Sequence, residues 1–318
     1  MQKHIRSRVN KDPRSSRRRV FKEALNPNFG FYYTINKTLQ KGKTKYQQLE
    51  LVDTDEFGTV LLLDNITQVA ERNEPHYHEP MVHPAFCCHP NPRNVLVIGG
   101  GDGGILREVL KYPSVKRVDH AELDEKVITF SKKYLKSVHK GSFDDPRVHV
   151  QVADGRAFTK QHPGEYDIII MDMTDPYGPS KMLYTREFFR IVKRAFRDSN
   201  GIFVMHSESP VARPEAFSCI QKTLRSVFKN VNPFYLYIQM YAVLWSITLC
   251  SDNIDASGIK AQTIDKKLKK SGIENLEIYS GQTHVSMQVQ FPYISQILKR
   301  SARIITDAKP DFPDNFIS

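Results

Sequence analysis

The stretch VLVIGGGDGG, residues 95–104, joins a continuous apolar run to a glycine-rich turn, and apolar residues then recur at helical spacing up to Leu110. A strand, a turn that lets the backbone approach a ligand and a helix form the first unit of a doubly wound nucleotide-binding fold. Glu122 ends the next strand-like run, about 20 residues on, where such folds place the acid that binds ribose hydroxyls. Together these features predict a nucleoside site that includes Gly99 and Gly101.

Strand-like and helix-like segments alternate along the chain after this turn. We expect strands at 95–98, 118–123, 148–153, 166–171 and 202–205, helices at 105–110, 127–135, 188–196 and 217–228, and a late hairpin at 234–237 and 244–250. This alternation is typical of a parallel sheet with right-handed crossovers. The predicted fold class is therefore α/β, a Rossmann-like sheet of the methyltransferase type that ends in an antiparallel hairpin.

The N-terminal part of the chain has a different pattern. Short β-type runs between Tyr46 and Arg72 predict a small antiparallel β domain, and a helix is expected over 75–86. Residues 24–44 are expected to be a loosely structured lead-in. Residues 1–23 contain nine Lys and Arg against two acidic residues, and they supply most of the net charge of +11. We expect a flexible basic arm at 1–23, a β domain at 24–74 and a Rossmann-like domain at 75–318.

Composition restricts the class of protein. The chain has 318 residues, of which 40% are hydrophobic, and no stretch approaches the roughly 18 unbroken apolar residues of a membrane helix. The basic start lacks an apolar run, which argues against a secretory signal. The four cysteines lack C-x-x-C spacing and predict buried, reduced thiols in a cytoplasmic protein. The arm is expected to be a solubilising tail, with a nucleic-acid contact or an organelle presequence as alternatives.

Carboxylates stand where nucleotide-binding folds usually bind anions. Asp102 lies inside the glycine turn, where it would repel phosphates and attract a cation such as a sulfonium. Asp154 ends the third strand, beside the expected adenine edge. Asp172 and Asp175 follow a buried strand and suit a cationic amine, which one acid can hold while the other takes its proton. Turn or helix-capping roles are the alternatives for these acids. The predicted negative cleft comprises Asp102, Glu122, Asp124, Asp154, Asp172 and Asp175.

Together these segments resemble the spermidine synthase (polyamine aminopropyltransferase) family from about Tyr46 to Ser251. The shared motifs are Tyr46-Gln47, Leu63-Asp64 through Gln68, Glu71-Arg72, Tyr77-His78-Glu79, His89-Pro90-Asn91-Pro92, the GGGDGG turn with Arg107-Glu108, and DMTDPYGP at 172–179. The resemblance implies an enzyme that moves the aminopropyl group of decarboxylated S-adenosylmethionine, a co-substrate and not a cofactor, to an amine. It also implies dimers or tetramers formed through the N-terminal strands.

The resemblance implies a role for each matching residue. The nucleoside would be surrounded by Gln47, Glu122, Asp124, Asp154, Gly155 and Pro179. The amine or aminopropyl nitrogen would be held by Asp102 and His78, the proton accepted by Asp172 with Asp175 beside it, and the acceptor channel lined by Tyr77 and Tyr241. The sequence YAVL at 241–244 departs from the Tyr-Pro-Ser-Gly of the family beside the acceptor site. Putrescine is the expected acceptor, and a longer polyamine is the alternative.

Other functions compete with this interpretation. The histidines at 76, 78, 83 and 89 have no companion acids at ligand spacing, so we expect no metal. A methyltransferase that uses S-adenosylmethionine would share the glycine turn, Glu122 and Asp154, but Asp102 would repel the carboxylate of its donor. A non-catalytic protein that binds polyamine or nucleic acid on the same fold is the second alternative.

Overall fold

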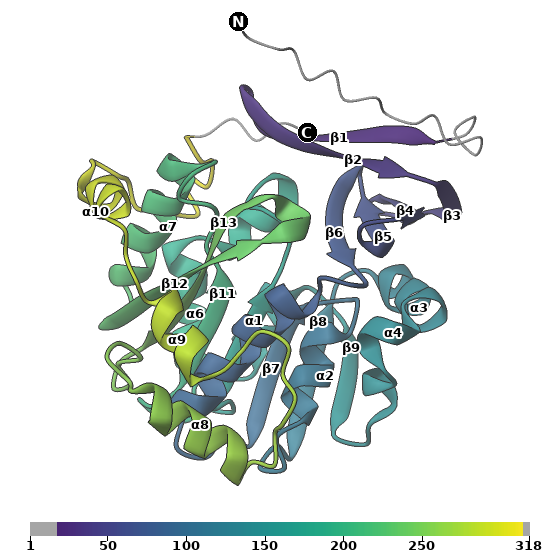
Figure 1. Ribbon diagram of the computed structural model, residues 1–318. Helices are drawn as coiled ribbons and strands as arrows, with labels where there is room; N and C mark the ends of the chain where they lie inside the picture. The colour runs from purple at the N-terminus through teal and green to yellow at the C-terminus, as the bar shows by residue number, and fades with distance from the viewer. Residues whose placement is uncertain (1–17, 314–318) are drawn as a thin grey trace, which may run out of the picture.

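Two antiparallel sheets precede the larger domain in the computed structural model, which describes residues 18–313 (Figure 1). β1 (Arg19–Asn26) pairs with β2 (Phe29–Ile35). A separate four-stranded sheet has the order β3 (Lys37–Lys43), β4 (Gln48–Thr54), β5 (Gly58–Leu63) and β6 (Ile66–Ala70).

The expected loose lead-in over 24–44 is therefore wrong, because β1, β2 and β3 occupy it. β1 also begins inside the segment expected to be a flexible arm, and the rest of that arm, residues 1–17, lies outside the described residues. The lead-in was misjudged because these strands bury few side chains. In β1, Phe21 and Leu25 are buried while polar and basic residues separate them, so the apolar signal is dilute.

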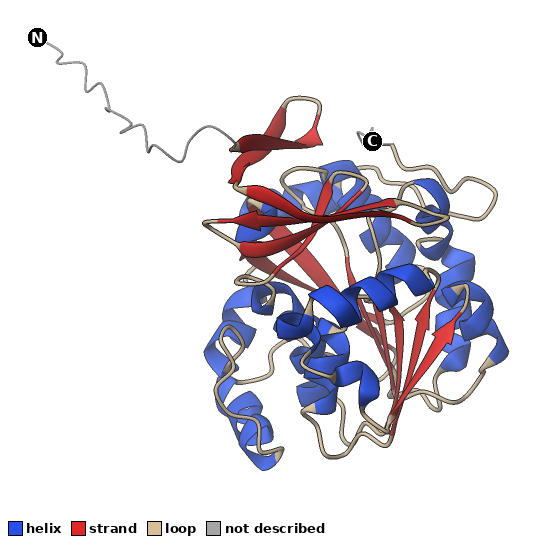
Figure 2. Cartoon of the chain, turned by 90° about the vertical axis from the view of Figure 1, so that its right-hand side faces the viewer, coloured by secondary structure: helices blue, strands red, loops and turns tan. Residues whose placement is uncertain are grey.

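A seven-stranded sheet with helices around it forms the larger domain (Figure 2). Its strand order is β12-β13-β11-β10-β7-β8-β9. The parallel strands are β7 (Asn94–Gly99), β8 (Arg117–Glu122), β9 (Val148–Val152), β10 (Ile168–Asp172) and β11 (Ile202–His206), and the antiparallel hairpin is β12 (Asn230–Ile238) and β13 (Val243–Ser251). The prediction of a Rossmann-like sheet with a late hairpin is confirmed.

Helices cover both faces of this sheet. They are α1 (Pro75–Cys88), α2 (Gly104–Leu110), α3 (Glu125–Tyr134), α4 (Lys136–His139), α5 (Gly155–Gln161), α6 (Arg186–Ala195), α7 (Pro214–Arg225), α8 (Ala261–Lys270), α9 (Gly281–Met287) and α10 (Pro292–Lys299), with 3-10 turns η2 (Ser142–Asp144), η3 (Gly178–Leu183) and η4 (Gln239–Tyr241). In β7, Val95 and Val97 pack in the cluster that contains α1 and α2, whereas Leu96 and Ile98 pack in the cluster that contains α6. Strands buried on both faces explain the unbroken apolar runs of the sequence.

The carboxyl ends of β7, β8 and β10 meet at one edge, and the strand order reverses between β7 and β10. Open α/β sheets bind their ligands at such a reversal. Asp172 pairs in register with Gly99, so the acidic strand end lies beside the glycine turn. Within residues 18–313, no helix has both the length and the apolar character needed to span a bilayer. Among the cysteines, Cys87, Cys219 and Cys250 are buried free thiols and Cys88 is half-buried.

Candidate active site

The glycine turn after β7 packs directly against the end of β10. Gly99 and Gly100 have φ angles of 76° and 69°, a region that favours glycine. The Gly100 amide donates to the Asp172 carbonyl oxygen at 2.9 Å, and a Cβ on Gly99 would lie 2.1 Å from that oxygen. A Cβ on Gly101 would lie 3.1 Å from the Glu122 carboxylate. The glycines therefore let one turn contact the acids of both neighbouring strands.

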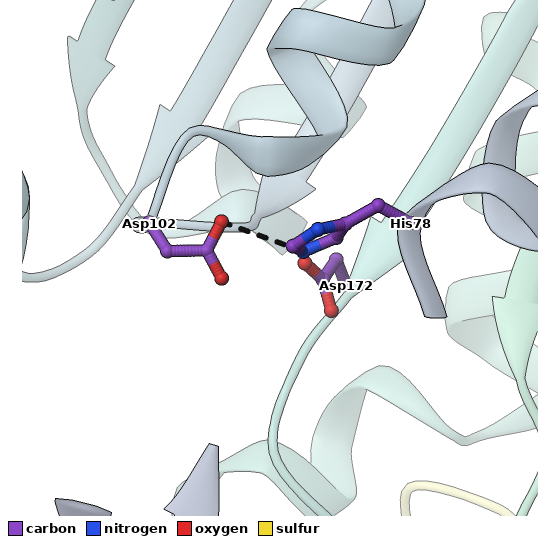
Figure 3. Close-up of side chains that lie close together, drawn as sticks. All are labelled: His78, Asp102 and Asp172. Atoms are coloured by element: carbon purple, nitrogen blue, oxygen red, sulfur yellow. Dashed lines mark ion pairs between the residues drawn. The ribbon is translucent and has the colours of Figure 1, made fainter. Parts of the chain in front are cut away.

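Three elements bring His78, Asp102 and Asp172 together (Figure 3). His78 comes from α1, Asp102 from the glycine turn and Asp172 from the end of β10, and one ligand atom of each lies within 4.8 Å of the others. His78 Nε2 is 3.5 Å from Asp102 Oδ1, and its Nδ1 is 2.5 Å from a Glu74 oxygen. Asp102 also accepts from the Gly104 amide at 2.6 Å.

The pKa values of the two aspartates in this cluster are shifted in opposite directions. Burial disfavours the charged form of His78, but Asp102 and Glu74 outweigh burial and raise the pKa of His78 to about 10. Burial acts to raise the pKa of Asp102 too, yet the His78 charge outweighs it and the pKa of Asp102 is lowered. Burial and the Asp102 charge raise the pKa of Asp172 to about 6. Asp102 is thus the fixed anion, and Asp172 is the carboxylate that can take up a proton near neutral pH.

Two tyrosines lie close to Asp172. Tyr77 donates its hydroxyl to Asp172 Oδ1 at 2.7 Å. Its ring meets the Tyr241 ring edge-on at 6.1 Å between centroids, and Tyr241 donates to the Gln68 carbonyl at 3.1 Å. Burial and the nearby Asp172 charge raise the pKa of Tyr77, so this phenol stays a neutral donor. The predicted channel residues and the predicted proton acceptor therefore share one site.

Asp175 belongs to a second cluster beside the first. It forms an ion pair with the buried guanidinium of Arg213, whose Nη1 is also 3.3 Å from Glu208. Arg213 Nε donates to the Leu25 carbonyl of β1 at 2.9 Å. Burial and the Asp175 charge raise the pKa of Glu208 to about 8. The sequence reasoning missed Glu208 and Arg213, although Glu208 follows β11 as the other acids follow their strands, and that signal could have found it.

The predicted ribose side also comes together. The Asp124 amide donates to Glu122 at 2.9 Å, and Gln47 Nε2 reaches the Asp124 carboxylate at 3.3 Å. Burial raises the pKa of Glu122 to about 7. Gln47 precedes β4 in the N-terminal sheet, so this unit contributes a side chain to the nucleoside side.

An open pocket of about 480 Å³ lies next to these acids. Its lining comprises Ile98, Ala121, Leu123, Asp154, Gly155, Arg156, Met173, Ser180, Met182 and Leu183. Asp154 also caps α5 by accepting from the Ala157 amide at 2.7 Å, so its capping role and its place in the pocket coexist. Pro179 lies in η3, the turn whose later residues form one wall. The lining is mostly apolar, which suits a planar base.

The cluster in Figure 3 also has to be considered as a metal site. Both ring nitrogens of His78 face carboxylates, Nδ1 at 2.5 Å from Glu74 and Nε2 at 3.5 Å from Asp102, an arrangement that suits a ring donating from both nitrogens. An organic cation needs carboxylates but no imidazole lone pair, and it fits this donor set better. His83 serves another network, with Tyr112 at 2.9 Å and Glu108 at 2.8 Å.

A Rossmann-like sheet whose glycine turn is lined with carboxylates suits a nucleoside that carries positive charge better than one that carries phosphates. Residues 74–260 match the spermine/spermidine synthase domain, and residues 19–71 match the spermidine synthase tetramerisation domain. The chain belongs to the spermidine synthase (polyamine aminopropyltransferase) family, and it is an aminopropyltransferase.

Relatives and solved structures agree with this assignment. The chain is 39% identical to the polyamine aminopropyltransferase of Nitrosomonas europaea, over 90% of this chain and 87% of that protein. It is 37% identical to the polyamine aminopropyltransferase of Pyrobaculum aerophilum, over 88% and 97% of the two chains. A crystal structure of spermidine synthase in complex with the transition state analogue AdoDATO superposes with a TM-score of 0.83 at 32% identity, covering 88% of this chain and 94% of that chain. The spermidine synthase of Thermotoga maritima gives a TM-score of 0.80 at 30% identity, with the same coverage.

Proposed function

We propose that this enzyme transfers the aminopropyl group of decarboxylated S-adenosylmethionine to putrescine, giving spermidine and methylthioadenosine, with Asp172 as the proton acceptor. The observation that carries the proposal is the unequal pair of aspartates. Asp102 is balanced by His78, whereas Asp172 has a pKa of about 6 and a neutral partner, Tyr77. The similarity to a spermidine synthase that was solved with the transition state analogue AdoDATO supports spermidine as the product.

The donor would lie with its base in the apolar pocket beside Asp154. Its ribose would meet Glu122, which Asp124 and Gln47 hold in place. The sulfonium and the aminopropyl chain would then face Asp102. A donor that keeps its carboxylate would bring a negative charge to Asp102 at short range, which disfavours S-adenosylmethionine and methyl transfer.

His78 takes a role different from the one the resemblance implied. A protonated imidazole repels an ammonium group, so direct contact with the amine nitrogen is unfavourable. His78 instead holds Asp102, and Glu74 holds His78 from the other side at 2.5 Å. Its positive charge also lowers the pKa of Asp172 against the opposing effects of burial and Asp102, so Asp172 stays mostly ionised at pH 7.

The acceptor amine has to lose a proton to react. An alkylammonium group has a pKa of about 10.4, so most of the acceptor arrives protonated. Asp172 takes the N–H proton as the nitrogen attacks the aminopropyl carbon, the C–N bond forms and the C–S bond breaks. No covalent enzyme intermediate is needed, because the sulfonium is already a good leaving group. Alignment of the two bound substrates supplies much of the rate.

Assembly through the N-terminal strands is part of the proposal. Large apolar side chains are exposed on β1 and β2, including Val20 at 56% and Tyr32 at 73%. Together with the match of residues 19–71 to a tetramerisation domain, this supports a homotetramer. Light scattering should give four times the chain mass, and Tyr32→Asp should lower it.

The proposed reaction is tested by a product assay. Decarboxylated S-adenosylmethionine is supplied with putrescine, cadaverine, spermidine or norspermidine in parallel, and ordinary S-adenosylmethionine serves as the control donor. We expect spermidine and methylthioadenosine as the main products from putrescine. Preference for a longer amine would contradict putrescine as the acceptor. A methylated product, or no turnover with any amine, would contradict the proposed reaction itself.

A further inference from the structure

The C-terminal part of the chain extends past the matched synthase domain, which ends at residue 260. It adds α8, α9 and α10, and α10 packs beside α7 (Figure 1). After α10 the chain runs back along α6 and α7. The Ile305 amide donates to Thr223 at 2.9 Å, and the Arg186 amide donates to the Ile305 carbonyl at 2.9 Å. Ile305 is fully buried, so residues 303–313 are anchored at their start.

Asp307 in this segment forms an ion pair with Arg156, which lines the proposed nucleoside pocket. Its carboxylate meets Arg156 in a bidentate pair at 2.9 and 2.5 Å, and it accepts from the Thr185 hydroxyl at 2.6 Å. Arg156 Nη1 also donates to the Met182 carbonyl at 2.8 Å. Arg156 and Met182 both line the pocket, so one carboxylate ties two of its walls together.

The end of the segment holds the same wall from outside. Lys181 in η3 pairs with Asp311 at 2.6 Å, and the Phe312 ring meets the Tyr184 ring edge-on at 6.1 Å. Tyr184 in turn donates to the Thr174 carbonyl at 3.1 Å, next to Asp175. The stretch that bears the reactive acids, 172–184, is therefore contacted by the C-terminal segment directly at Lys181 and Tyr184 and indirectly at Thr174.

We infer that residues 303–313 form a strap along the outer side of the donor site, in which Asp307 is a positioning residue that acts through Arg156 and Thr185 to fix the η3 wall. The inference rests on the proposed function. Without Asp307, Arg156 would lose its bidentate partner and leave an unpaired cation beside a pocket that receives a sulfonium. The η3 wall would be held at Met182 only by the bonds of Arg156 and Thr185 to the Met182 carbonyl. Both effects weaken donor binding and leave the acceptor side untouched.

The test uses the full chain with Asp307→Asn, Asp307→Glu and, as a matched control, Asp144→Asn. Asp144 forms an exposed ion pair with Lys132 and does not line the pocket. Asp307→Asn should raise the KM for decarboxylated S-adenosylmethionine and the Kd for methylthioadenosine by on the order of tenfold. The KM for putrescine and the kcat should change less than about twofold. Asp307→Glu should recover much of the affinity, and Asp144→Asn should match the wild type.

Amide hydrogen exchange supplies a readout that does not need turnover. Residues 178–183 should exchange faster in Asp307→Asn and in Phe312→Ala than in the wild type. Unchanged donor affinity and exchange, or equal changes in donor and acceptor KM with a lowered Tm, would overturn the strap. Failure of the wild type to turn over any amine would instead contradict the proposed function, while the exchange experiment would still report on the strap.

Discussion

Two neighbouring clusters each place cations among carboxylates, and they differ in which carboxylate is left without a cationic partner. Around His78, Arg107 pairs with Glu74 at 2.6 and 2.7 Å and the imidazolium lies between Glu74 and Asp102, which leaves Asp172 with the phenol of Tyr77. Around Arg213, the guanidinium pairs with Asp175 and also contacts Glu208.

This difference between the two clusters gives their carboxyl groups, Glu208 and Asp172, different roles. Glu208 is fully buried and its pKa of about 8 lets it stay protonated at neutral pH, so the Arg213 cluster is close to neutral and rigid. Asp172 is partly open to the site and its pKa is about 6, so it is ionised but ready to accept a proton. A group poised near the working pH is what general base catalysis requires.

The largest expected effect comes from Asp172→Asn. The amide keeps the shape but cannot accept the proton, so turnover should fall on the order of 10²-fold or more. Steady-state assays with saturating donor measure this. Near-normal turnover would show that another group accepts the proton.

Loss of Arg213 should break the second cluster. Arg213→Leu leaves Asp175 without its cation and removes the link to Leu25, and we expect unfolding free energy to fall by about 2 kcal/mol, below the usual cost of a broken buried pair because Asp175 is partly exposed. Removing the cation raises the pKa of Glu208 above its wild-type value of about 8, so the deficit should grow as pH rises through about 8. Denaturant melts at about pH 6 and about pH 9 measure it. Arg213→Lys is the matched control, and an equal loss in both variants would rule out the charge argument.

Asp172→Asn should also stabilise the fold at high pH. The pKa of Asp172 is raised from 3.8 to about 6, so its contribution to stability is full below about 3.8 and is lost as pH rises through 6. The variant should gain about 3 kcal/mol at pH 8 and almost nothing at pH 4. Thermal melts at both pH values report this, and a loss of stability at pH 8 would contradict the assigned charge state.

The smallest effect is expected from Tyr77→Phe. The Tyr77 hydrogen bond lowers the pKa of Asp172, so its removal should move the acidic limb of the kcat/KM profile to higher pH. The loss at pH 6 should be about a few-fold, and at pH 8 it should be smaller. Tyr241→Phe is the control, because that hydroxyl bonds to Gln68. If both variants gave the same pH profile of kcat/KM, the Tyr77 hydrogen bond would have no specific effect on the pKa of Asp172.

The sequence predicted the sheet and its acidic edge because both follow local rules. Unbroken apolar runs mark strands buried on two faces, and acids after strand ends share one edge whatever the loop lengths. The contacts of Arg213 and Asp307 could not be predicted, since they join residues that lie 38 and 151 positions from their partners. The β1 and β2 strands were missed because each buries only two side chains, Phe21 and Leu25 in β1 and Tyr33 and Ile35 in β2, so their alternation of buried and exposed residues is short. The sequence therefore predicted the site residues that follow strand ends, and it did not predict the residues that only tertiary contacts bring into place.

The most direct test of the central claim is a carbon-13 NMR titration of the aspartate carboxyl groups, with Asp172→Asn used to assign the signal. The account predicts that the Asp172 carboxyl titrates near pH 6 and that the acidic limb of the kcat/KM profile follows it. An Asp172 carboxyl that titrates at or below pH 3.8, or an acidic limb near pH 6 that persists in the residual activity of Asp172→Asn, would contradict it.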